Sequence, residues 1–209
     1  MAAALALRNC HIHSRSLPRM KSMTPPPNYG AVIPGCIFRS GYPLEANQGF
    51  LETLKLKTVL TLVSAITPPA HAEWMKENGI EHIQIPILPN KEGKPSTPVV
   101  NFNSALAVIL RRSSHPILIH CNQGRHRTGC VVACFRRVIG EDLIAAISEY
   151  HTYADPKARP PDEVWIRNYD ATALARVAAH EHWIGSPQQP TARTLTPVAS
   201  RTGAPKVRA

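Results

Sequence analysis

Short runs of consecutive apolar residues alternate with amphipathic segments through the middle of the chain. The run 58–63 is rich in β-branched and apolar residues, which suits a strand buried on both faces of a parallel sheet. Residues 117–119 form a second apolar run, and the segments 36–39 and 80–85 predict two further strands. Strands that alternate with helices indicate an α/β sheet, whose ligand crevice is expected at the carboxyl ends of its strands.

Apolar residues at helical spacing mark the segments between and after these runs. Pro68 and Pro69 suit the start of a helix and Gly79 its end, because proline fits the first helical turn and glycine the C-terminal cap. His115, which precedes Pro116, is expected at the surface. Helices are predicted for residues 49–54, 70–78, 102–110, 128–138, 142–153 and 162–180.

The net charge of the chain is concentrated at its two ends. The 209 residues include 24 Lys and Arg against 14 Asp and Glu, a formal net charge of +10. Residues 1–21 and 184–209 each hold four of the basic residues and no acid, which leaves 16 basic and 14 acidic side chains between them. We expect a flexible basic arm over 1–27, one folded domain over 28–183 and a disordered basic tail over 184–209. Nucleic acid is not an expected partner, because the body of the chain is nearly neutral.

Composition also argues against several classes of protein. Every apolar run is well short of the length of about 18 residues that a membrane span needs, so no transmembrane segment is expected. Five cysteines without paired Cys-x-x-Cys spacing or a signal peptide argue against a disulfide framework or a structural zinc site, and suit a reducing compartment. We therefore expect a cytoplasmic or nuclear protein. A mitochondrial transit peptide in the acid-free arm is the alternative.

The segment His-Cys-Asn-Gln-Gly-Arg-His-Arg-Thr-Gly, residues 120–129, lies where the second apolar run meets the following helix. Five residues separate Cys121 from Arg127, a spacing that lets the backbone curl until successive N–H groups point inward at the positive end of the helix. Gly124 provides the backbone freedom of a tight loop, and the Arg127 guanidinium can grip two phosphate oxygens at once. The residues predicted to bind phosphate in this loop are Asn122, Gln123, Gly124, Arg125 and His126.

Cys121 would form the floor of this loop. A cysteine at a helix N-terminus and near arginine is favoured as the thiolate, the nucleophilic form. Its attack on phosphorus would give a phosphocysteine that water then hydrolyses, a route that needs no metal or cofactor. Thr128 can donate its hydroxyl to the sulfur, with a plain helix N-cap as the alternative. Cys130 and Cys134 are predicted core residues, with a disulfide to Cys121 as the alternative.

The string 120–129 resembles the signature of cysteine-dependent tyrosine and dual-specificity phosphatases. Its basic loop, 124–130, resembles in particular the plant and fungal atypical dual-specificity phosphatases. Similarity extends to 38–43, to positions within 50–62 and to positions within 149–159, and covers about residues 28 to 175. The resemblance implies the compact phosphatase domain, a mostly parallel sheet flanked by helices, over residues 28–183.

Two substrate classes follow from that resemblance. Members of the family act on phosphotyrosine and phosphoproteins, or remove the β-phosphate of an inositol pyrophosphate. A densely phosphorylated ring needs many cations around a small pocket, which Arg125, His126 and Arg127 offer. Lys157 and Arg159 would add two more, with an exposed solvated charge pair as the alternative. A phosphotyrosine pocket would instead need depth and an aromatic clamp, so the inositol pyrophosphate is favoured over a phosphoprotein.

The chain departs from the wider superfamily at the general acid. Protein tyrosine phosphatases usually place an aspartate before the signature, whereas the first aspartate here is Asp142. Glu92, in the loop 86–98, is the candidate substitute, with a solvated loop charge as the alternative. A diphosphate also leaves more readily than a phenolate or an alkoxide and can dispense with an acid. The missing aspartate therefore favours phosphoanhydride chemistry.

Two other classes of function compete with an enzyme. A phosphate sensor with weak catalysis would retain its ligand without turnover, but the intact pair Cys121 and Arg127 argues against it. A nucleic-acid-binding protein would show salt-sensitive binding through residues 1–21 and 184–209. Only these two ends support that interpretation.

Overall fold

The computed structural model describes residues 22–91 and 97–184. Their five strands form one sheet in the order β1-β2-β5-β3-β4. Strands β2, β5, β3 and β4 run parallel, and β1 pairs antiparallel with β2 at one edge. The strands are β1 (Gly30–Ile33), β2 (Ile37–Ser40), β3 (Thr58–Thr61), β4 (Glu81–Gln84) and β5 (Ile117–His120). The predicted mostly parallel α/β sheet is confirmed, with β1 as an additional strand that the apolar pattern missed.

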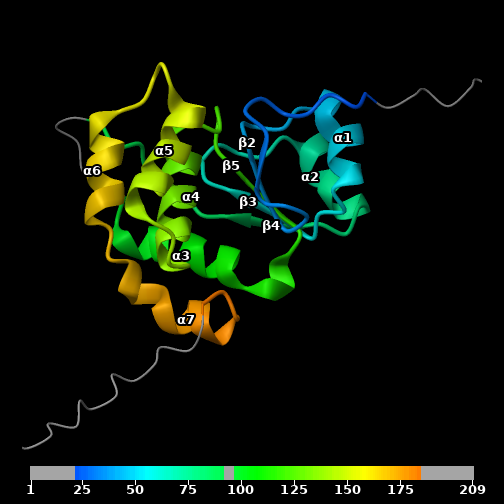
Figure 1. Cartoon of the computed structure of the whole chain (residues 1–209). Coiled ribbons are helices and arrows are strands. Elements are labelled where there is room, and N and C mark those ends of the chain that lie inside the picture. Colours follow the sequence, from blue (N-terminus) through cyan, green and yellow to red (C-terminus); the bar gives the residue numbers. More distant parts are fainter. Residues whose placement is uncertain (1–21, 92–96, 185–209) are drawn as a thin grey trace, which may run out of the picture.

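Helices cover both faces of the sheet (Figure 1). Helices α1 and α2 lie on one side, and α3 to α6 lie on the other. The α-helices of the described residues are α1 (Gln48–Thr53), α2 (Pro69–Glu77), α3 (Val99–Leu110), α4 (His126–Val138), α5 (Leu143–Ala154), α6 (Pro160–Asn168) and α7 (Ala175–His180). None of these helices is both long and apolar enough to cross a bilayer.

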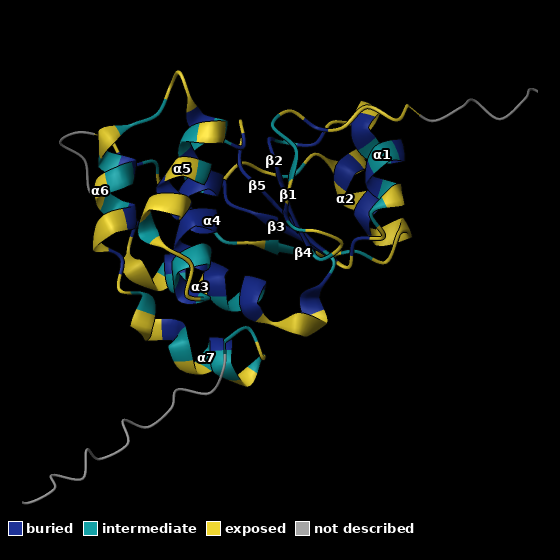
Figure 2. Cartoon of the chain, in the orientation of Figure 1, coloured by how far each residue is buried: buried dark blue, intermediate teal, exposed yellow. Residues whose placement is uncertain are grey.

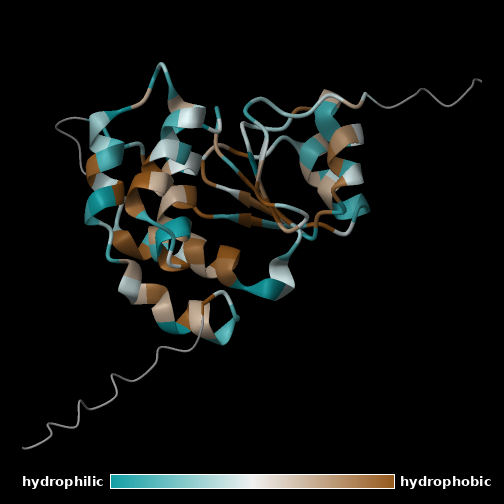
Figure 3. Ribbon diagram, viewed as in Figure 1, coloured by the Kyte–Doolittle hydropathy of each residue, from teal (hydrophilic) through white to brown (hydrophobic). Residues whose placement is uncertain are grey.

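The central strand β5 is buried along its whole length, and its successive residues face opposite layers. Leu118 packs in a smaller cluster with Trp74 of α2, whereas Ile117 and Ile119 join the larger cluster that includes Phe135 of α4. Figures 2 and 3 show the same arrangement as a buried, hydrophobic sheet centre between helices with exposed outer faces. Burial on both faces explains why this strand is a continuous apolar run instead of an alternating one.

The segment predicted as one helix over 162–180 consists of three shorter elements. Helix α6 begins at Pro160, where proline fits the first turn, and ends before Tyr169, whose ψ of 127° is extended. The carboxylate of Asp170 then accepts a hydrogen bond from the backbone of Thr172 and starts the 3₁₀ turn Ala171–Leu174. Helix α7 follows. The prediction of one continuous helix was wrong because Asp170 caps a new turn.

His115 lies in the interior, so its predicted surface position was wrong. The imidazole is 8% exposed, and its Nε2 atom donates a hydrogen bond of 2.8 Å to the carbonyl of Ile109. The ring of Trp183, near the end of the described chain, lies against it, with ring centroids 5.6 Å apart. The Trp183 indole also donates to the carbonyl of Leu110. A residue from the C-terminal part of the domain therefore covers a histidine that would otherwise meet solvent.

Cys130 and Cys134 are confirmed as core residues, with exposures of 1% and 0% on the inner face of α4. Both thiols are free in this structure, so the alternative disulfide to Cys121 is not formed. Burial raises the pKa of both thiols well above the usual range, which keeps them protonated at neutral pH.

Candidate active site

The predicted phosphate loop lies at the carboxyl end of the central strand. His120 is the last residue of β5, residues 121–125 form the loop, and α4 begins at His126. This is the position where ligands meet an open parallel sheet, because the strand ends and a helix N-terminus converge there. Cys121 is 3% exposed at the base of the loop.

Three consecutive carbonyl groups of the loop accept hydrogen bonds from the segment 28–42. The backbone N–H of Tyr42 donates to Asn122 over 3.0 Å, Asn28 Nδ2 donates to Gln123 over 2.7 Å, and Arg39 Nη2 donates to Gly124 over 2.8 Å. The C=O and N–H of a trans peptide point in opposite directions. The N–H groups of the three following residues therefore point away from that segment, as an anion nest requires.

Gly124 is the position where the loop touches this segment most closely. Its φ of +68° lies in the left-handed region, and a Cβ atom there would lie 2.5 Å from the backbone of Ser40 and Gly41. Both the backbone angle and the lack of space therefore exclude a side chain at this position. The predicted need for glycine at this position has a second cause, the close approach of another backbone.

A pocket of about 390 Å³ opens over the loop. Five lysine and arginine side chains line it, and the described residues that line it include no Asp or Glu and no Phe, Tyr or Trp. The lining residues are Pro89, Lys91, Cys121, Asn122, Gln123, Arg125, His126, Arg127, Lys157 and Arg159. The structure thus brings together the loop residues and the two distant basic residues that the sequence analysis predicted, and adds Pro89 and Lys91.

His126 and Arg127 differ in what they offer the pocket. The Nε2 atom of His126 donates a hydrogen bond to the backbone carbonyl of Lys157, so this ring fixes the position of the loop that carries Lys157 and Arg159. No described residue forms a hydrogen bond or an ion pair with the guanidinium of Arg127, which leaves its donors for an anion. Glu92 lies outside the described residues.

Thr128 is fully buried as the third residue of α4, and its Oγ1 atom has no hydrogen-bond partner among the described residues. The bond to the Cys121 sulfur is not formed in this structure. The alternative of a helix N-cap is wrong, because Arg125 occupies that position. The Thr128 hydroxyl is thus a buried donor near the start of α4 that is left unused among the described residues.

His120, at the end of β5, links the loop to the sheet through a chain of hydrogen bonds. Its Nδ1 atom donates to the Cys121 carbonyl over 3.4 Å, so the neutral ring accepts at Nε2 from Thr61 over 2.8 Å. The Thr61 oxygen in turn accepts from His82 over 2.9 Å. Burial lowers the pKa of His120 to about 3, which keeps the ring neutral at any physiological pH. Its role is therefore to hold the loop and not to exchange protons.

A buried carboxylate connects the two segments that line the pocket besides the phosphate loop. Asp162 of α6 is 1% exposed, accepting hydrogen bonds from Asn90 Nδ2 over 3.0 Å and from the Tyr150 hydroxyl over 2.8 Å. The Tyr150 oxygen accepts from the backbone N–H of Arg159. Asp162 thereby joins the segment of Pro89 and Lys91 to the segment of Lys157 and Arg159. The sequence analysis missed this residue, because nothing local distinguishes it from a helix-terminal aspartate.

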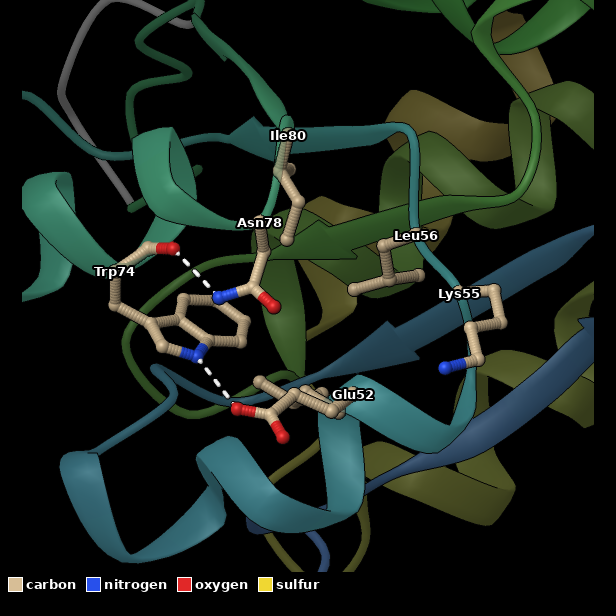
Figure 4. Close-up of a pocket in the computed structure, with 7 residues that line it drawn as sticks. Glu52, Lys55, Leu56, Trp74, Asn78 and Ile80 are labelled. Carbon is tan, nitrogen blue, oxygen red and sulfur yellow. Dashed lines mark hydrogen bonds between the residues drawn. The ribbon is translucent and has the colours of Figure 1, made fainter.

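A second, smaller pocket lies between α1 and α2 (Figure 4). It encloses about 210 Å³ and shares no lining residue with the pocket over the phosphate loop. The indole of Trp74 donates to Glu52 across it over 3.3 Å, and Asn78 donates to the Trp74 carbonyl over 2.9 Å. None of the predicted site residues lies here. Within the described chain, no group of three or more His, Cys, Asp or Glu residues is placed to hold a metal ion.

Comparison with known proteins gives a consistent result. The model of the tyrosine phosphatase family matches residues 23–186. Inositol diphosphatase SIW14 of Saccharomyces cerevisiae is 38% identical over 165 residues, which cover 78% of this chain and 58% of the yeast protein. Inositol diphosphatase DSP1 of rice, Oryza sativa, is 37% identical over 157 residues, which cover 75% and 70% of the two chains.

A solved structure shows that the likeness extends to the fold over most of this chain. The crystal structure of the core catalytic domain of PP-IP phosphatase SIW14 from S. cerevisiae superposes with a TM-score of 0.72 at 36% identity, and covers 78% of this chain and 98% of that domain. The predicted resemblance to the plant and fungal group is confirmed. With its Cys-x5-Arg loop at the end of the central strand, this chain belongs to the tyrosine phosphatase family.

Proposed function

We propose that this protein is a cysteine phosphatase that removes the β-phosphate of inositol pyrophosphates. The observation that carries the proposal is the pocket itself, where five cationic side chains surround one nucleophilic sulfur. A substrate with many phosphates gains from each of those cations, whereas one phosphorylated side chain would use few of them. The names of the yeast and rice relatives, both inositol diphosphatases, support the same choice.

The mechanism follows from the positions of these groups. The Cys121 thiolate attacks the β-phosphorus, a sulfur–phosphorus bond forms, and the bond from that phosphorus to the bridging oxygen breaks. The leaving group carries the α-phosphate away on the inositol ring. Water then attacks the phosphocysteine, the sulfur–phosphorus bond breaks, and the step releases inorganic phosphate with both water protons and restores the thiolate. The outward-held carbonyls leave amide N–H groups for the equatorial oxygens, and Arg127 would bind two of these oxygens.

Glu92 is proposed as the general acid for substrates with poor leaving groups. A phosphoanhydride leaves as a phosphate anion that is stable near neutral pH, so its release depends little on an acid. Glu92→Gln should therefore slow an aryl or alkyl phosphate and spare an inositol pyrophosphate. An unchanged pH–rate profile for the alkyl phosphate would remove Glu92 from the mechanism.

The alternative substrate is a phosphoprotein. The described residues that line the pocket provide no aromatic clamp for a phosphotyrosine ring, which disfavours this choice. Side-by-side measurement of kcat/KM on an inositol pyrophosphate, a phosphotyrosine peptide and a phosphoinositide decides between them. We expect the inositol pyrophosphate to be preferred and Arg127→Ala to abolish turnover of all three. A preference for the peptide would overturn the substrate assignment and keep the phosphatase assignment.

A further inference from the structure

Arg39 is an arginine in the interior of the sheet. It lies in β2 between Gly30 of β1 and Ile119 of β5, and its exposure is 0%. A charged side chain is rarely buried completely, because removal of its hydration is costly unless a counter-charge compensates. The position therefore requires an explanation that packing alone does not provide.

Among the described residues, no carboxylate pairs with the Arg39 guanidinium. Nη2 donates to the Gly124 carbonyl over 2.8 Å, and the guanidinium carbon lies 3.7 Å from the centre of the Tyr153 ring. Its Nε and Nη1 atoms have no hydrogen-bond partner among the described residues. Glu149, a neighbouring acid, is already paired with Arg136 over 2.8 Å. Arg39 thus holds one loop carbonyl and keeps two of its nitrogen atoms without a partner.

Four titratable side chains interact with the charge of Arg39. Burial lowers the pKa of Arg39 to about 10, against the opposing attraction of Glu149, Tyr153, Cys121 and Cys130, so the side chain is still a cation at neutral pH. Arg136 offsets the charge of Glu149, Tyr153 contributes its ring face, and Cys130 stays a neutral thiol. Of these neighbours, Cys121 is the one that belongs to the phosphate loop, whose Gly124 carbonyl Arg39 holds.

We propose that Arg39 is a positioning residue that serves as the buried counter-cation of the phosphate loop. Through the Gly124 carbonyl it turns the N–H of Arg125 toward the bound phosphate, and through its charge it favours the ionised sulfur. The second part rests on the proposed function, in which Cys121 reacts as the thiolate. A purely structural role, in which Arg39 only joins β2 to the loop, is the competing explanation.

The test separates the charge of Arg39 from its hydrogen bond. Arg39→Lys keeps the positive charge, and Arg39→Gln keeps an N–H donor without charge. Arg137→Gln is the matched control, because Arg137 also donates to backbone carbonyls, those of Ile166 and Tyr169, but does not line the pocket. Each protein is alkylated with iodoacetamide between pH 4 and 9, and modification of the Cys121 peptide is followed by mass spectrometry.

The alkylation rate reports the ionised sulfur whatever the substrate is. Arg125, His126 and Arg127 from the loop and α4, and Lys91, Lys157 and Arg159 from the segments around it, line the same pocket as Cys121. His120 precedes it in β5, Arg39 holds the loop at Gly124, and Cys130 of α4 is the other neighbouring thiol. All these groups except Arg39 are unchanged in the two Arg39 variants. A difference between Arg39→Gln and Arg39→Lys is therefore assigned to the charge at this position.

We expect the midpoint of the alkylation profile to move upward by about one pH unit in Arg39→Gln and to stay within about 0.3 unit of the native value in Arg39→Lys and Arg137→Gln. Competition by inorganic phosphate should weaken about tenfold in Arg39→Gln.

Unchanged midpoints in all variants, with lower melting temperatures alone, would overturn the proposal. If Arg39→Gln does not fold, Arg39→Met takes its place as the uncharged variant, with the same upward shift of the midpoint expected. Absence of inositol pyrophosphate turnover in the native protein would refute the proposed function and leave this result valid.

Discussion

The carboxylate of Asp162 accepts a hydrogen bond of 3.0 Å from Asn90, a residue 72 positions earlier in the chain. This bond lies in the interior and joins α6 to the loop that follows β4. Because Asn90 is next to Lys91 and Asp162 also holds Tyr150 below Arg159, one carboxylate fixes the spacing of cations on opposite walls of the pocket. The geometry of the pocket thus depends on a residue that does not line it.

Asp162→Ala should weaken both the fold and the binding of polyanions. The change leaves the Asn90 amide and the Tyr150 hydroxyl buried without their acceptor, at a cost of about 3 kcal/mol in the free energy of unfolding. We expect KM for an inositol pyrophosphate to rise about tenfold, while an aryl phosphate changes little. Urea unfolding and steady-state kinetics measure the two effects.

Asp162→Asn is the matched control for this change. The Oδ1 atom of Asn90 has no partner in the structure, so its amide can turn over and accept from the new side chain. We therefore expect stability and KM close to the native values. A KM that is the same in Asp162→Ala as in the native protein would refute the role assigned to this carboxylate.

Gly124→Ala should inactivate the enzyme. The added Cβ would lie 2.5 Å from backbone atoms of Ser40 and Gly41, which forces the loop away from the segment that holds its carbonyls. Loss of the aligned amides should reduce kcat about 100-fold or more. Gly35→Ala isolates the conformational cost, because Gly35 also has a positive φ of 73° but nothing within 4 Å of a Cβ. That variant should lose about 1 kcal/mol of stability and keep its activity. Equal activity losses in both variants would argue against the contact at Gly124.

Protonation of His120 should lower the free energy of unfolding in acid. The pKa of the imidazole is near 6.5 when the chain is unfolded and about 3 when it is folded, so the unfolded state binds the extra proton between these values. Stability therefore falls as the pH drops from about 6.5 to 3, by up to about 1.4 kcal/mol per pH unit from this group. Urea unfolding of His120→Asn over this range should show a slope that is smaller by nearly one proton. The same slope in both proteins would contradict the assignment.

Lys157 and Arg159 should affect the choice of substrate more than the rate of the chemical step. Both line the pocket, and Lys157 is held there through its backbone contact with His126. The double variant Lys157→Gln/Arg159→Gln should raise KM for an inositol pyrophosphate about 100-fold and leave an aryl phosphate within about threefold. The difference should shrink at high salt, because these charges are partly exposed. Arg176→Gln, on the exposed surface of α7, is the control for net charge. Parallel losses on both substrates would show that the pair acts in catalysis.

Much of the fold was predictable because its strands carry a strong pattern. The runs 58–63 and 117–119 are apolar on both faces, and the structure places them side by side in the centre of the sheet. Strand β1 was not predicted, because it lies at the edge of the sheet and three of its four residues are at least partly exposed. The break at Tyr169 was missed because Asp170 starts a new turn through its own side chain, an effect that competes with helical periodicity over only a few residues.

The site was predictable where its residues are contiguous and unpredictable where they are not. The spacing of Cys121 and Arg127 encodes a loop geometry, so the phosphate cradle follows from local sequence. Arg39 and Asp162 act through contacts with residues 85 and 72 positions away, and no periodicity or spacing reports such contacts. An arginine inside an apolar strand was the available signal for Arg39, because a buried charge needs a counter-charge.

Covalent labelling of Cys121 tests the central claim most directly. The protein is mixed with an inositol pyrophosphate that carries ³²P in its β-phosphate, quenched within milliseconds and digested, and the labelled peptide is identified by mass spectrometry. We expect the label on Cys121 in the native protein, its decay with release of inorganic phosphate, and no label or turnover in Cys121→Ser. Label on another residue, or phosphate release that survives in Cys121→Ser, would contradict the proposed phosphocysteine mechanism.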